Sequence, residues 1–140
     1  LNITNYEKMH KFNPSEFGAI VLDESSCLKG FQSKYRTQLT EFVQGIDYRL
    51  AATATPSPND LIELINHADW LGVMSSKEAI ATFFTQDGNT TKKWRLKNTC
   101  KEDFWRWVAS WAICVRKPSD LGFTDEDAGF DLPGLNIHEV

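Results

Sequence analysis

The sequence predicts an α/β fold in which a parallel sheet is followed by a helical segment. Residues 17–24 begin with an unbroken run of apolar and small residues, which is typical of a strand buried on both faces of a parallel sheet. A helical pattern over residues 33–43 and a second strand pattern over residues 48–52 follow. Strand, helix and strand of this length form a βαβ unit with a right-handed crossover. We therefore expect two parallel, neighbouring strands.

Both ends of the chain show short alternating patterns. Residues 1–4 and residues 135–138 alternate between apolar and polar side chains, which predicts a short strand at each place. The sequence starts inside such a pattern, without a methionine, and stops soon after another. This suggests a piece of a longer protein.

The residues after the βαβ unit predict two helices. Ser57 is a good N-cap and Pro58 suits the first helical position, so a helix should start there. Apolar residues keep helical spacing until Gly72, which is expected to end the helix. A second helix should begin near Ser76.

A third, tryptophan-rich helix is predicted further along the chain. Residues 86–98 show no clear period apart from a turn signal at residues 88–89. Thr99 and Glu102 then form a capping-box pattern that opens a helix, which completes a helical segment over residues 76–117. Large side chains at helical spacing on this helix are expected to pack in the core: Phe104, Trp107, Val108 and Trp111.

The composition is that of an ordinary globular chain. The 140 residues are 41% hydrophobic and 24% charged, which favours a single domain with its own core. A formal net charge of −4 argues against a protein that coats nucleic acid non-specifically. The three cysteines, Cys27, Cys100 and Cys114, share no metal-ligand spacing and fit reduced thiols. Without a signal peptide or a membrane-spanning run, we expect a cytoplasmic protein.

Two polar strand ends are expected to meet at the carboxyl edge of the sheet. Asp23 and Glu24 follow the first strand, and residues 53–56 (Thr-Ala-Thr-Pro) follow the second. Open α/β sheets bind their ligands at this edge. Adjacent carboxylates there repel each other unless a cation lies beside them, and Mg²⁺ prefers oxygen ligands. The residues thus offer a magnesium site that includes Asp23, and the commoner alternative for an acidic pair by itself is a solvated strand end.

These motifs resemble those of a known family. Asp23-Glu24 with the following Ser-Ser-Cys-Leu-Lys-Gly, and later Thr53-Ala54-Thr55-Pro56, are similar to motifs II and III of superfamily 2 helicases, closest to the Swi/Snf-like branch of DNA-dependent ATPases. Residues 3–7 resemble the motif just upstream, which touches the DNA backbone. Residues 111–123 and 130–133 are similar to the region that leads to the second lobe, particularly in phage and prophage helicases.

The resemblance implies a fold and a domain organisation. The chain would be the C-terminal part of the first RecA-like (P-loop NTPase) lobe, with motifs II and III in a βαβ core over residues 1–75. The helical segment, residues 76–117, would be appended to this core. Residues 118–140 would be a linker towards a second lobe outside the chain.

The resemblance also implies a role for each motif residue. Asp23 would hold Mg²⁺ through water, and Glu24 would polarise the water that attacks the γ-phosphate of ATP. Thr53 and Thr55 would couple the nucleotide state to the grip on DNA. Contacts to DNA phosphates, which fix position without reading sequence, would come from Thr4 and Asn5.

A cluster of basic residues offers two interpretations. Lys92, Lys93 and Arg95 surround Trp94, with Lys97 and Lys101 nearby. They could contact the DNA backbone beside a stacking platform. The alternative is a solvated basic loop, which is the commoner case and the interpretation we favour from the sequence.

Departures from the family pattern limit what the chain can do alone. Ser25 and Ser26 stand where the family often has Ala-His or Gly-His, and no Gly-x-x-x-x-Gly-Lys-[Ser/Thr] loop is present. We therefore predict no ATPase activity for the isolated chain. The alternatives are a nucleic-acid-binding module without catalysis and a Mg²⁺-dependent nuclease that uses the acidic pair. An exposed sheet edge would also favour self-association.

Overall fold

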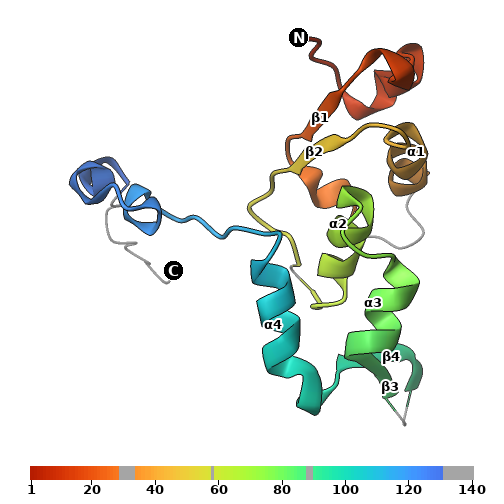
Figure 1. Ribbon diagram of the computed structural model, residues 1–140, viewed down its shortest axis with the longest axis vertical. Coiled ribbons are helices and arrows are strands. Elements are labelled where there is room, and N and C mark those ends of the chain that lie inside the picture. The colour runs from red at the N-terminus through yellow and green to blue at the C-terminus, as the bar shows by residue number, and fades with distance from the viewer. Residues whose placement is uncertain (29–33, 58, 88–89, 131–140) are drawn as a thin grey trace, which may run out of the picture.

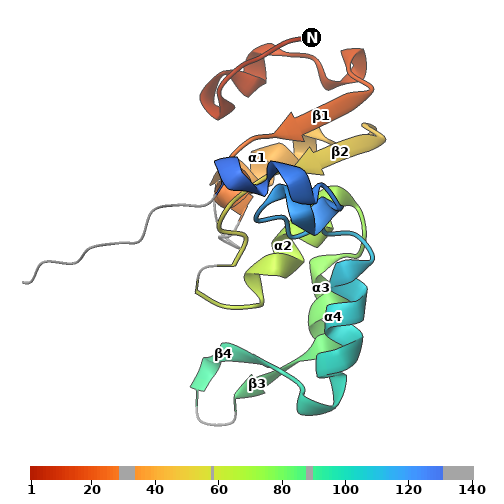
Figure 2. The same cartoon turned by 90° about the vertical axis from the view of Figure 1, so that its left-hand side faces the viewer.

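The computed structural model describes residues 1–28, 34–57, 59–87 and 90–130. Within these ranges the chain is a mixture of helices and strands with two small sheets, one parallel and one antiparallel. The two sheets lie at opposite ends of the molecule, with helices between them (Figures 1 and 2). The strand predicted at residues 135–138 lies outside the described residues.

The parallel sheet is the predicted βαβ unit. Strand β1 (Ala19–Leu22) pairs with strand β2 (Tyr48–Ala51), and helix α1 (Lys34–Phe42) lies between them in the chain. The register runs from Ala19 opposite Tyr48 to Leu22 opposite Ala51. The prediction of two parallel, neighbouring strands is confirmed.

Only one face of the parallel sheet packs against a core, so the predicted burial of the first strand on both faces is wrong. On the inner face, β1 and β2 meet α1, the 3-10 helix η3 (Ser25–Leu28) and a later helix. We call this part of the molecule the sheet region. Its outer face carries Val21, Tyr48 and Leu50, which are 63%, 74% and 57% exposed. The buried residues of its core are Leu22, Leu28, Leu39, Val43 and Trp70.

Helix α2 (Glu63–Leu71) begins later than predicted. The N-cap position is Ile62, which makes no side-chain capping bond, so the predicted start at Ser57 is wrong. The preceding residues form turns instead, and the side-chain amide of Asn59 donates to the Glu63 carboxylate at 3.0 Å. Pro58 lies outside the described residues. The predicted end is confirmed: Gly72 adopts a φ of 78° and its N–H bonds to carbonyls of the last turn.

The antiparallel sheet lies inside the segment predicted to be helical. Helix α3 (Ser76–Phe83) begins as predicted, with Ser75 as its N-cap. It is followed by strands β3 (Phe84–Asp87) and β4 (Thr90–Leu96), so the helical prediction for residues 76–117 is wrong in this part. The hairpin forms because Phe84 and Leu96 face each other across the strands and are both buried.

Helix α4 (Lys101–Ala109) closes the core of this second part, which we call the hairpin region. Phe104 is fully buried, and its ring contacts Phe83 and Phe84 edge-on, which confirms its predicted packing. Trp107 and Val108 are half-buried against the same core, whereas Trp111 is not part of that core and contacts the Trp107 ring. The predicted capping box is wrong, because the N-cap position is Cys100 and makes no side-chain bond. The buried core residues are Ile62, Leu64, Ile65, Ala79, Phe83, Phe84, Leu96 and Phe104.

Helix α2 belongs to both regions. Trp70 packs in the core of the sheet region, and its indole N–H donates to the Leu39 carbonyl at 3.3 Å. Five residues earlier, Ile65 is buried in the core of the hairpin region. An ion pair of 2.8 Å between Arg36 and Asp69 fixes α1 against α2.

The two end segments are less regular. Residues 1–4 form no strand, and the side chains of Leu1 and Ile3 are exposed, so that prediction is wrong. With no neighbouring strand to pair with, alternation alone does not make a strand. The 3-10 helix η1 (Tyr6–Lys11) follows. At the other end, residues 112–130 leave the body and fold on themselves (Figure 1).

Candidate functional site

The two polar strand ends lie side by side. The Ala52 N–H donates to the Leu22 carbonyl at 2.8 Å, and the Ser25 N–H donates to the Ala52 carbonyl at 2.8 Å. These two bonds extend the hydrogen-bond ladder between β1 and β2 beyond the strand ends. One involves the residue just before the acidic pair and the other the residue just after it. The Asp23–Glu24 turn and Thr53 therefore come together at the carboxyl edge, as the topology predicts.

The acidic pair forms a tight, exposed turn. Glu24 has a φ of 51°, and it is the one non-glycine residue with positive φ in the part of the chain that the structure describes. Its N–H donates to the Asp23 carboxylate at 3.1 Å. Both side chains are exposed, so their oxygens are open to a hydrated cation.

The threonine turn beside the acidic pair has its own internal bond. The Thr53 hydroxyl oxygen accepts from the Thr55 N–H at 3.1 Å. Thr53 is half-buried, whereas Thr55 is exposed. This arrangement fixes the backbone after β2 and leaves the Thr55 side chain at the surface.

Ser25 lies directly beneath this edge. It is fully buried, and its hydroxyl has no hydrogen-bond partner among the described residues. Burial of a hydroxyl without a hydrogen-bond partner lowers the stability of the fold. Within the described part of the chain, the Ser25 hydroxyl is thus an unsatisfied polar group directly under the acidic turn.

Tyr6 connects the N-terminal segment to the acidic turn. Its hydroxyl donates to the main-chain carbonyl of Asp23, and the Cys27 thiol is hydrogen-bonded to the same hydroxyl. Burial raises the pKa of the Tyr6 phenol, and the charges of Cys27, Asp23 and Glu24 add to the rise. Burial also raises the pKa of the Cys27 thiol. Both groups therefore remain protonated at neutral pH.

The two residues before Tyr6 are at the surface. Thr4 and Asn5 are exposed, and Asn5 is the N-cap of η1, where its side-chain oxygen accepts from the Lys8 N–H at 3.2 Å. Their position at the start of η1 brings the predicted DNA contacts within two residues of Tyr6.

The basic cluster lies elsewhere. Lys92, Lys93 and Arg95 belong to β4, at the opposite end of the molecule from β1 and β2 in both views (Figures 1 and 2). Arg95 is exposed, and the side chains of Lys92 and Lys93 lie outside what the structure describes. Trp94 packs against the core of the hairpin region. The structure does not bring these residues to the acidic pair.

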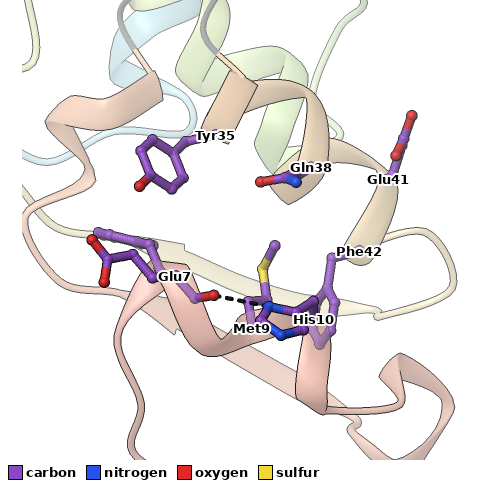
Figure 3. Close-up of a pocket in the computed structure, with 8 residues that line it drawn as sticks. Glu7, Met9, His10, Tyr35, Gln38, Glu41 and Phe42 are labelled. Carbon is purple, nitrogen blue, oxygen red and sulfur yellow. Dashed lines mark hydrogen bonds between the residues drawn. The ribbon is translucent and has the colours of Figure 1, made fainter.

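A groove of about 660 Å³ runs between η1 and α1, and Tyr6 is part of its lining. Figure 3 shows Glu7 and His10 on one side of it and Tyr35 and Glu41 on the other. His10 Nδ1 lies 2.9 Å from the Glu7 carbonyl oxygen. No local pattern in the sequence predicts this groove, because its two walls are more than twenty residues apart in the chain.

Sequence reasoning missed Tyr6. Tyr6 stands within a predicted motif, but its bond to Asp23 spans 17 residues and no spacing pattern reveals it. Among the described residues, no three His, Cys, Asp or Glu side chains gather into a metal-binding group. None of the described helices has the length and apolar character needed to cross a membrane.

Comparison of the chain with protein-family models, with curated proteins and with solved structures finds no match. What remains to indicate a function is the geometry of the strand ends and the motifs themselves.

Proposed function

We propose that this chain is part of the motor of an ATP-dependent DNA helicase or translocase. It would form the later part of the first RecA-like lobe of a superfamily 2 protein in the Swi/Snf-like branch. The proposal assigns the phosphate-binding loop and the second lobe to sequence outside these 140 residues. The observation that carries it is the parallel pairing of β1 and β2, which brings two motif-bearing strand ends to one edge.

The acidic pair suits the chemistry of this motor. Exposed carboxylate oxygens at a sheet edge fit a hydrated Mg²⁺, which would neutralise charge on the phosphates of ATP. In this scheme Asp23 holds the hydrated ion, and Glu24 orients and polarises the attacking water. The exposed hydroxyl of Thr55, held by the turn at Thr53, couples this edge to the DNA-bound state.

The DNA would lie along the N-terminal segment. Thr4 and Asn5 supply small polar donors of the kind that contact phosphates, and such contacts position a protein without reading base sequence. Arg95, with Lys92 and Lys93, would form a separate backbone contact on the hairpin. Because contacts from Arg95, Lys92 and Lys93 to phosphates release counterions from the DNA, we expect binding to weaken as salt is added.

The test is ATP hydrolysis by the protein that contains this chain, measured with and without duplex DNA. Glu24→Gln should lower the DNA-stimulated turnover by about 10²–10⁴-fold, the usual contribution of a positioned acid–base group. The matched control is Glu16→Gln, which changes an exposed glutamate of the 3-10 helix η2 (Pro14–Glu16) and should leave turnover unchanged. Turnover that survives Glu24→Gln would contradict the proposal.

The isolated chain provides a second arm of this test. Lacking the phosphate-binding loop, it should show no ATPase activity. DNA binding by the containing protein without DNA-stimulated hydrolysis would favour the non-catalytic binding module. Mg²⁺-dependent cleavage of DNA that disappears in Asp23→Asn would favour the nuclease.

A further inference from the structure

The backbone of Glu24 is strained. A φ of 51° places Glu24 in the left-handed region, which side chains other than glycine rarely adopt. Such a conformation persists only where surrounding contacts hold it. The direction of the Glu24 carboxylate depends on this turn, so the contacts that hold the turn also determine where the carboxylate points.

Three contacts hold this strained turn. The Asp23 carboxylate accepts the Glu24 N–H at 3.1 Å, and the Ser25 N–H is anchored to Ala52 at 2.8 Å. The third comes from another part of the chain, since the Tyr6 hydroxyl donates to the Asp23 carbonyl. The peptide between the two carboxylates is thus bonded at its N–H by Asp23 and at its carbonyl by Tyr6.

Tyr6 is well placed to transmit a movement. It is the first residue of η1, directly after Thr4 and Asn5. Its side chain packs against the core of the sheet region, and its hydroxyl meets the Cys27 thiol. A shift at the start of η1 therefore moves the hydroxyl that holds the acidic turn.

We propose that Tyr6 is a positioning residue that fixes the Asp23–Glu24 peptide and links DNA bound at Thr4 and Asn5 to the direction of the Glu24 carboxylate. The inference rests on the proposed function, because it takes Thr4 and Asn5 as the DNA contact. It adds a direct route from that contact to the acidic pair through one side chain. The route does not pass through the threonine turn.

The test uses Cys27 as a reporter in a chain that carries Cys100→Ser and Cys114→Ser. The rate at which iodoacetamide alkylates Cys27 is measured with and without a fluorescein-labelled DNA duplex, and the label gives the DNA affinity by anisotropy. In this background DNA should change the rate about fivefold, the factor that corresponds to one ordinary hydrogen bond. Tyr6→Phe should abolish this response while the DNA affinity stays the same.

The control is Tyr35→Phe, which removes a hydroxyl from the opposite wall of the groove and should leave the response intact. An equal response to DNA in Tyr6→Phe overturns the inference and leaves the proposed function standing. Absence of DNA binding by the unmodified chain contradicts the DNA contact itself, and with it the inference.

A second measurement does not depend on the folding of a variant. In the unmodified chain, the ¹⁵N-amide resonance of Glu24 should shift when duplex DNA is added, because its peptide group is the one that Tyr6 holds. A Glu24 amide that stays in place while DNA binds overturns the inference. A purely structural role for Tyr6 predicts no shift.

Discussion

The sheet region and the hairpin region differ in how completely their cores are enclosed. In the hairpin region, α2, α3, α4 and the β3–β4 hairpin surround one aromatic cluster. In the sheet region, helices cover one face of a two-stranded sheet, and the other face is exposed. Parallel sheets are normally covered on both faces. The part that carries the candidate site is therefore the part with the less complete core.

The comparison suggests that stability and function are separable in this chain. The aromatic cluster of the hairpin region is distant from the acidic turn, and the turn is held by main-chain bonds and by Tyr6. Helix α2 joins the two, since it contributes Trp70 to one core and Ile65 to the other. Changes confined to one region should thus be felt in the other mainly through α2.

Removal of the Phe104 ring should have the largest effect. Phe104→Ala empties a fully buried site among aromatic rings and should lower the free energy of unfolding by about 3–5 kcal/mol. Trp105→Ala is the matched control, because Trp105 is 49% exposed, and it should cost much less. Urea unfolding followed by circular dichroism gives both values.

Amide hydrogen exchange then shows whether the two regions respond separately. In Phe104→Ala, the amides of β3, β4 and α4 should lose protection while those of β1 and β2 change less. Equal losses in both sheets would mean that α2 couples the regions into one cooperative unit, and the separation would be wrong.

The exposed sheet face should have an intermediate effect, on association. Val21 and Leu50 are paired across the strands, and both are largely exposed. If two copies cover this face, Val21→Thr with Leu50→Thr should remove about 1 kcal/mol for each covered side chain and weaken the dimer by about tenfold or more. Light scattering over a concentration series measures this, and Val73→Thr serves as an exposed control outside the sheet.

A constant monomer mass at all concentrations would remove the prediction of self-association. Dimers that persist unchanged in the double variant would show that another surface is responsible. Under either result the two cores would still differ in how completely they are enclosed. The exposed face of the sheet would then have no role in the association of two copies.

The sequence predicts the sheet region better than the hairpin region, and the reason is physical. An unbroken apolar run bounded by turn residues, as in residues 17–22, favours a strand, and β1 forms there, although with one face exposed. In contrast, β4 (Thr90–Leu96) is rich in charge, and among its side chains that the structure describes, Trp94 and Leu96 pack on the core. Such a strand is determined by its partner rather than by its own pattern.

The motif residues of the candidate site could be predicted from the sequence, but the contacts that hold these residues in place could not. The topology of two parallel strands is sufficient to bring Asp23 and Thr53 to one edge. The bond from Tyr6 to the Asp23 carbonyl and the left-handed conformation of Glu24 arise from tertiary packing. Neither the bond nor this conformation can be predicted from the local sequence. The Ser57 cap failed for a related reason, since cap-forming residues also favour turns.

The smallest expected effect is a loss of stability in alkali that arises in the sheet region. The folded chain raises the pKa of the Cys27 thiol above its ordinary value of 9.0, because burial disfavours the thiolate. The unfolded chain therefore loses this proton first, and the stability that is fully present below about pH 9.0 decreases as the pH rises further. Tyr6 adds to the decrease above its ordinary value of 10.0, for the same reason.

Urea unfolding from neutral pH to above pH 10.0 measures this decrease. Cys27→Ser should make the unfolding free energy less dependent on pH in the alkaline range, whereas Cys100→Ser, in the hairpin region, should leave that dependence as it is. If both variants reduce the dependence equally, the alkaline sensitivity does not arise at the acidic turn. The sheet region, with its buried ionisable groups, would then not differ from the hairpin region in its sensitivity to alkali.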